Sequence, residues 1–265
     1  MPQNTALPIN SQAVRLGIAG AALTIVGILT SGPIGTVLVS AIHPSPPWQD
    51  AELFALNFHW IQTVPFFAGF ALVGGYVVLF AALQAMAAPR HRAAATSAVI
   101  FAAVFATFIF FNYICQTTFI PALAQSYRPE YEPLISALSF ANPLSLSWAI
   151  EMWGYAFLGV ASWIAARIFD RGGVETAVAR LMDVNAVISI AGAFVTVARP
   201  GWVLTSAGLI NYVAWNIVVL AISILIVVAL RKRLRDAEVS GRGNSEEERR
   251  SLADLALRPN PTAMR

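Results

Sequence analysis

Residues 143–169, PLSLSWAIEMWGYAFLGVASWIAARIF, decide how this chain must fold. The stretch is long and apolar enough to cross a bilayer, because about 20 apolar helical residues span the hydrocarbon layer. Well inside the apolar runs of this chain, Glu151 is the only Asp, Glu, Lys or Arg. A charged side chain at the centre of a membrane helix costs about 2.5 kcal/mol or more on insertion scales. Glu151 is therefore the first candidate for a functional residue.

The composition of the whole chain is that of a membrane protein. The 265 residues are 57% hydrophobic and 12% charged, whereas a typical soluble domain is about 25% charged. The apolar runs are continuous rather than alternating, which favours helices over strands in lipid. We predict an all-α bundle of six transmembrane helices, with a flexible lead at 1–12, one domain at 13–233, spans at about 14–42, 58–88, 94–120, 144–169, 181–198 and 203–231, and a mobile tail at 234–265.

Three places depart from this simple pattern. Gly32-Pro33 should kink the first span or end its regular part, since proline cannot continue the helical hydrogen bonds. The segment 50–64 either extends the second span or lies along the membrane interface. In the tail, Ser245 with Glu248 is a capping-box pattern, so a short helix is the alternative to a mobile chain there.

Basic residues fall on alternate loops of this arrangement. They gather at Arg15, the turn 90–92, the connector 167–180 and the segment after residue 230. Cytoplasmic loops carry an excess of Lys and Arg, so we expect both termini in the cytoplasm, in a bacterial inner (plasma) membrane. The net charge of +3 arises after residue 230, where basic residues suit contact with anionic membrane lipid. The charge therefore does not indicate a nucleic-acid partner.

Most polar residues within the spans fall in the outer half of the membrane under this orientation. Trp148 and Tyr155 lie three and four residues from Glu151 and share its helical face. Polar side chains in a bundle face inward, and an aromatic space with a few polar groups is the usual form of a ligand site. We predict a ligand-binding site formed by Glu151, Asn112, Gln116, Asn211, His59, Trp148 and Tyr155, surrounded by Tyr113, Trp153, Tyr212 and Trp215, with His59 and Arg199 at its outer mouth.

Each of these residues also has a plainer interpretation. Glu151 is alternatively a structural strut, paired with Arg199, His59 or an asparagine across the bundle. The amide side chains at 112, 116 and 211 are alternatively hydrogen bonds that lock helices together. His59 is alternatively an interfacial histidine without a ligand.

Motifs of known catalytic or cofactor chemistry are absent from the sequence. One cysteine excludes an internal disulfide, and three histidines leave little for a histidine-rich metal centre. There is no HExxH, no phosphate-binding glycine loop and no dinucleotide motif. No lysine lies within a span, which excludes a retinal Schiff base of the usual kind. We therefore predict no catalytic residue, metal or cofactor.

Three functions remain open from the sequence. The first is binding or translocation of a small apolar or amphipathic molecule, with Glu151 as its polar anchor. The second is an accessory or scaffolding subunit with partner membrane subunits, which outward glycine-rich faces on the first two helices would favour. The third is a membrane-embedded enzyme acting on a lipid or isoprenoid, with Glu151 as general acid or base and His59 as its partner.

Overall fold

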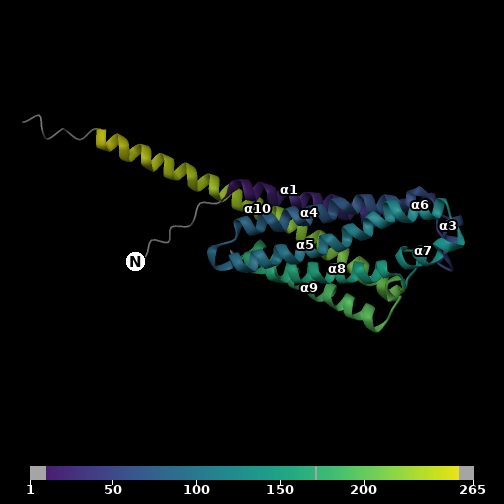
Figure 1. Cartoon of the computed structure of the whole chain (residues 1–265). Coiled ribbons are helices and arrows are strands. Elements are labelled where there is room, and N and C mark those ends of the chain that lie inside the picture. The colour runs from purple at the N-terminus through teal and green to yellow at the C-terminus, as the bar shows by residue number, and fades with distance from the viewer. Residues whose placement is uncertain (1–9, 171, 257–265) are drawn as a thin grey trace, which may run out of the picture.

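The computed structural model describes residues 10–170 and 172–256 (Figure 1). No strand occurs within these residues. The six predicted membrane spans are confirmed, and the chain is an all-α, multi-pass membrane protein. Its segments long and apolar enough to cross a membrane are Ser11–Ile42, Trp60–Met86, Pro89–Gln125, Leu146–Ile168, Val174–Ala198 and Ser206–Ala237.

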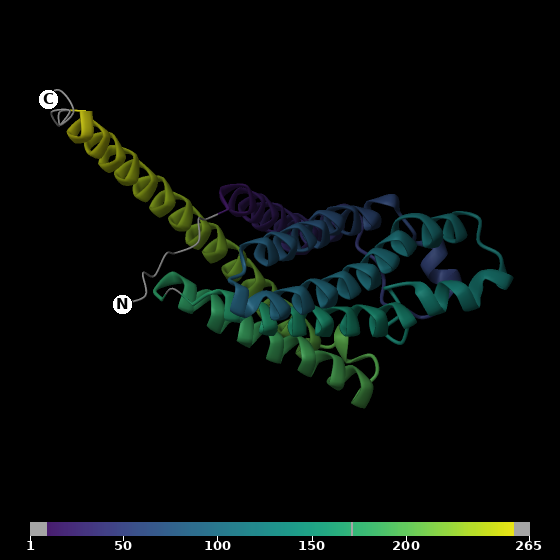
Figure 2. The same ribbon diagram turned by 60° about the vertical axis from the view of Figure 1, so that its left-hand side comes forward.

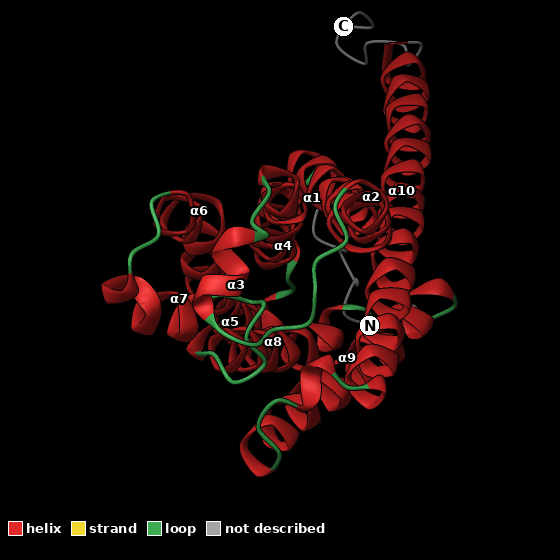
Figure 3. Ribbon diagram, turned by 90° about the vertical axis from the view of Figure 1, so that its right-hand side faces the viewer, coloured by secondary structure: helices red, strands yellow, loops and turns green. Residues whose placement is uncertain are grey.

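The spanning helices form a closed ring. Each packs on the next along the chain, and the last packs on the first. Figure 3 shows this arrangement along the bundle from one end. The helices of the ring are α1 (Ser11–Leu29), α4 (Val64–Met86), α5 (Arg92–Ile114), α8 (Leu146–Ala165), α9 (Val174–Ala198) and α10 (Ser206–Ala256).

Helices α1 and α4 pack backbone against backbone. A Cβ on Gly20 would lie 2.7 Å from the Leu79 amide nitrogen, and one on Gly75 would lie 2.6 Å from the Thr24 amide nitrogen. A Cβ on Gly27 would overlap the backbone of Leu72. Membrane helices use small residues in this way to approach each other closely.

Proline and wide helical turns interrupt two of the spans. The first span turns from α1 into the π-helical segment η1 (Thr30–Ile34), which contains Pro33, and continues as α2 (Gly35–Ile42). The third span passes through η4 (Cys115–Phe119) into α6 (Ile120–Gln125), whose second residue is Pro121. The predicted end of the regular helix at Gly32-Pro33 is observed. Such π-bulges are frequent at functional sites.

Short helices cover one end of the bundle, which we call the α3–α7 end. It contains α3 (Ala51–Leu56), η2 (Trp60–Thr63), η5 (Pro129–Tyr131) and α7 (Glu132–Leu138). The segment 50–64 is thus a separate short helix followed by a 3₁₀ turn that leads into α4. Asp50 caps α3 by accepting from the Leu53 amide at 2.7 Å, and His59 caps η2 by accepting from the Ile61 amide at 3.2 Å.

Charged residues hold the opposite end, which we call the basic end. Arg233 of α10 donates to both carboxylate oxygens of Glu175, at 2.7 and 2.6 Å, and both side chains are buried. Arg90 of η3 (Pro89–His91) forms an ion pair with Asp170. Burial alone would raise the pKa of Asp170, but the hydrogen bond and charge of Arg90, with His91 and Arg233, outweigh it and lower that pKa.

The bundle is filled in the half nearer the basic end. Phe80 and Leu83 of α4, Met182 of α9, and Ile226 and Leu230 of α10 are almost fully buried there. Close packing of this kind excludes voids larger than a water molecule. The half nearer the basic end therefore leaves little room for a ligand.

Two predicted boundaries differ from the structure by more than six residues. The fifth span begins at Val174 rather than 181, because Glu175 finds a buried partner in Arg233 and the helix can start with a charged residue. Helix α10 continues to Ala256, well past residue 234, where we expected a mobile tail (Figure 2). The sequence has no proline between 234 and 258 to stop it. Residues 1–9 and 257–265 of the predicted lead and tail lie outside the described ranges.

The glycine contact of α1 with α4 is testable by paired substitutions. Gly20→Ala should lower the melting midpoint in detergent, since overpacking typically costs about 1–3 kcal/mol. Gly74→Ala is the matched control, because nothing lies within 4 Å of its added Cβ and alanine is favoured over glycine in a helix by about 0.5–1 kcal/mol. Circular-dichroism melts check both; equal midpoints for the two variants would contradict the close contact.

Candidate functional site

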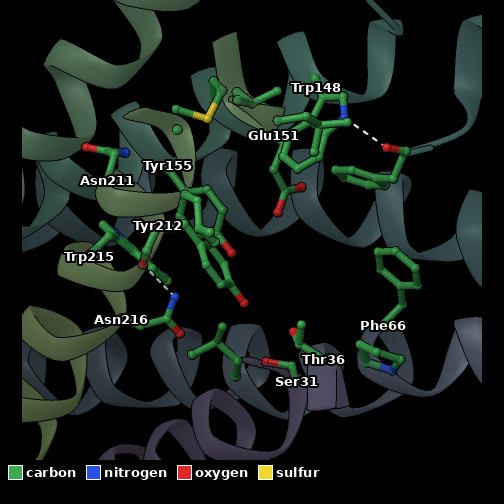
Figure 4. Close-up of a pocket in the computed structure, with 18 of the residues that line it drawn as sticks. Ser31, Thr36, Phe66, Trp148, Glu151, Tyr155, Asn211, Tyr212, Trp215 and Asn216 are labelled. Atoms are coloured by element: carbon green, nitrogen blue, oxygen red, sulfur yellow. Dashed lines mark hydrogen bonds between the residues drawn. The ribbon is translucent and has the colours of Figure 1, made fainter. Parts of the chain in front are cut away.

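A cavity of about 430 Å³ lies in the half of the bundle nearer the α3–α7 end. Its walls include residues of α4, α5, α8, α9, α10, the first span and the 3₁₀ turn before α10. Figure 4 shows the Glu151 carboxylate directed into this space from α8, with Ser31 and Thr36 of the first span on the opposite side. The first span thus brings two hydroxyl groups to the wall that faces Glu151, Ser31 from η1 and Thr36 from α2.

The Glu151 carboxylate is held from the side of α5. Asn112 donates through Nδ2 to Oε2 of Glu151 at 3.0 Å, and the Tyr113 hydroxyl donates to Oε1 at 3.3 Å. Asn112 Nδ2 also donates to the Ser147 carbonyl at 2.8 Å, which fixes the amide against the first turn of α8. Glu151 is only 7% exposed. Its position is therefore fixed by neutral donors, while its carboxylate still borders the cavity.

Aromatic side chains line the cavity on either side of Glu151. The Tyr155 hydroxyl lies 3.4 Å from that of Tyr113, and the Tyr155 ring meets the Trp215 ring at 4.5 Å. Trp148 donates through Nε1 to the Phe140 carbonyl at 3.0 Å. The predicted helical face of Trp148, Glu151 and Tyr155 is directed at the cavity.

The other predicted site residues divide between the cavity and its surroundings. Asn211 lines the cavity. Gln116 instead binds the segment that leads from α7 to α8. Its side chain donates to the Leu138 carbonyl at 2.7 Å and accepts from the Phe140 amide at 3.2 Å. His59 does not line the cavity; its ring stacks on His43 at 4.9 Å. Arg199 is exposed at the end of α9, and in the described part of the chain no ion pair joins it to Glu151.

Several important residues did not stand out in the sequence. Ser31 and Thr36 are small hydroxyl residues in an apolar run, and only the Gly32-Pro33 interruption marks their position. Trp153, expected near the site, is directed outward against Phe194 at 5.8 Å. Two buried polar atoms near the cavity, Trp215 Nε1 and Asn112 Oδ1, have no hydrogen-bond partner among the described residues.

A second cavity of about 500 Å³ lies under the short helices of the α3–α7 end. It shares wall residues with the first, including Thr36, Gln62, Phe66 and Phe140. Gln116 lines this second cavity. The two spaces therefore adjoin, separated by side chains rather than by a helix.

Among the described residues there is no group of three or more His, Cys, Asp or Glu side chains that could hold a metal ion. The chain matches no protein-family model, no curated protein and no solved structure. Its function is therefore argued from the site itself.

The link between Asn112 and Glu151 should be worth measurable stability. Asn112→Leu keeps the approximate volume but leaves a buried carboxylate and the Ser147 carbonyl short of a donor, which typically costs about 1–3 kcal/mol. The matched control is Asn216→Leu, because the hydrogen bonds given for Asn216 join it to Tyr212 of its own helix rather than to another helix. Thermal melts should show the larger loss for Asn112→Leu; the reverse order would contradict a structural role of this contact.

Proposed function

We propose that this protein binds or translocates a small apolar or amphipathic molecule, held in the cavity with Glu151 as its polar anchor. The observation that carries the proposal is a cavity of about 430 Å³ that reaches a buried carboxylate. Ligand sites typically occupy about 300–1,000 Å³ and combine apolar walls with a few placed polar groups.

The environment of Glu151 supports a ligand role beyond that of a strut. A strut would be packed against its partner, whereas Glu151 borders open space on the side away from Asn112 and Tyr113. Trp215 belongs to the cavity wall, and its buried Nε1 donor has no partner within the described ranges. Buried polar groups are normally hydrogen-bonded, and an exception asks for an explanation.

The two alternative functions, a scaffolding subunit and a membrane-embedded enzyme, are less well supported by the structure. The glycine-rich faces that would suit partner subunits are largely used inside the protein, between α1 and α4. The enzyme hypothesis assigned His59 as the partner of Glu151, and His59 does not line the Glu151 cavity. Ligand binding is therefore the function that the geometry supports best.

We further propose a bacterial inner membrane, with the basic end in the cytoplasm and the cavity in the outer half of the bilayer. The fold supports this orientation because it gathers Arg90, Arg167 and Arg233 at one end of the bundle. These residues come from three separate segments of the chain, and cytoplasmic loops are enriched in such residues.

Ligand binding is tested by blocking the cavity. Decanol, decyltrimethylammonium and decanoate differ in head group but share a chain, and at least one should raise the melting midpoint of the protein in maltoside detergent. Thr36→Phe places a ring in the cavity and should abolish that shift. Val37→Phe is the control, because Val37 is 68% exposed and does not line the cavity. The proposal fails if no amphiphile shifts the wild-type midpoint, or if both variants respond equally.

The orientation is tested by labelling single cysteines on intact cells. In a Cys115→Ala background, Glu130→Cys lies at the α3–α7 end and Ala88→Cys at the basic end, both at exposed positions. A membrane-impermeant maleimide should label only the cysteine at 130. Labelling of the cysteine at 88 alone would reverse the orientation.

A further inference from the structure

The cavity is lined by one acidic side chain and by no basic side chain. Glu151 is the only charged residue among those that line it, and none of the others is Lys, Arg or His. Its carboxylate accepts hydrogen bonds from two neutral donors, Asn112 and Tyr113. A carboxylate in a low-dielectric space is costly unless it is paired or neutralised. A positively charged ligand would supply the missing partner.

A connected series of rings surrounds this carboxylate. Trp148 meets Phe140 at 4.6 Å, Phe140 meets Phe66 at 5.3 Å, and Phe66 meets Tyr113 at 5.6 Å. On the other side, Tyr155 meets Trp215 at 4.5 Å. Aromatic faces attract cations, and cages of such rings are the usual recognition device for quaternary ammonium groups.

The cavity also borders apolar side chains on the outside of the bundle. Leu204, Leu209 and Tyr212 line it and are 54%, 60% and 44% exposed. They lie at the start of α10 and in η7 (Trp202–Leu204), and Val39 of α2 lines the same cavity. An apolar group can therefore extend from the rings toward the lipid side of the bundle.

From these three observations we propose that the ligand is a lipophilic organic cation. Its positive centre, an ammonium or phosphonium group, lies beside Glu151 among the rings, and its apolar groups extend between α2 and α10. Organic anions are disfavoured because the lining offers them no cationic group and the carboxylate repels them. The inference rests on the proposed function and names the chemical class of its ligand.

Two probes of matched size and shape but opposite charge test the inference. Tetraphenylphosphonium and tetraphenylborate are titrated separately into the purified full-length protein in maltoside micelles, with binding followed by calorimetry. Tetraphenylphosphonium should bind saturably and at least tenfold more tightly than tetraphenylborate. Thr36→Phe should remove that binding, which places it in this cavity.

Variants of the carboxylate identify the source of the preference. Glu151→Gln should weaken tetraphenylphosphonium binding at least tenfold, and Glu151→Asp should retain the preference for the cation. Glu130→Gln, which changes an exposed residue of η5, should behave as wild type. Far-UV circular dichroism shows whether each variant folds. If Glu151→Gln does not fold, the preference of the wild-type protein and its loss in Thr36→Phe still decide the question.

The outcomes separate this inference from the proposed function. Equal or tighter binding of tetraphenylborate, or full binding by folded Glu151→Gln, would overturn the cation assignment. So would the absence of tetraphenylphosphonium binding in a protein that a decyl amphiphile still stabilises, although ligand binding itself would then stand. If neither tetraphenyl probe binds and no decyl amphiphile stabilises the protein, both proposals are wrong.

Discussion

The contact on which the site depends is the pair of hydrogen bonds from Asn112 and Tyr113 to the Glu151 carboxylate. Both donors belong to α5, so the acid is fixed from one side and open on the other. The contact also sets the packing of a third helix, because a Cβ on Gly69 of α4 would overlap the Tyr113 ring. Glu151 of α8 is thus bonded to α5, and α4 packs on the same tyrosine of α5. The cavity lies beside this contact of three helices.

The two halves of the bundle differ in how they treat charge. At the basic end Glu175 and Arg233 neutralise each other in a bidentate pair, and the neighbouring core is filled by apolar side chains. Breaking such a buried pair leaves an uncompensated charge, which is why both members are held so closely. In the cavity the single acidic side chain, Glu151, accepts from the neutral donors Asn112 and Tyr113, and the rings around it leave space. The same ring of helices is therefore filled in one half and contains a cavity in the other.

The sequence predicts the six spans because each apolar run is long enough to cross a bilayer, whatever its neighbours are. It also predicts that Trp148, Glu151 and Tyr155 share a face, since that depends on helical period alone. Other features depend on distant partners. Glu175 resembles a loop residue until Arg233, 58 positions away, is placed beside it. His59 was assigned to the site by depth, but the breaks in the chain on either side of α3 carry it to the α3–α7 end.

Helix α10 contributes to both ends of the molecule. Trp215 borders the cavity and Arg233 holds Glu175, and they are 233 − 215 = 18 residues apart on one unbroken helix. Eighteen residues make five turns at about 3.6 residues per turn, so the two side chains leave the helix in the same direction, about 27 Å apart. The helix therefore acts as a rigid shaft: any rotation about its axis that withdraws the indole from the cavity wall must swing the guanidinium away from its carboxylate through the same angle.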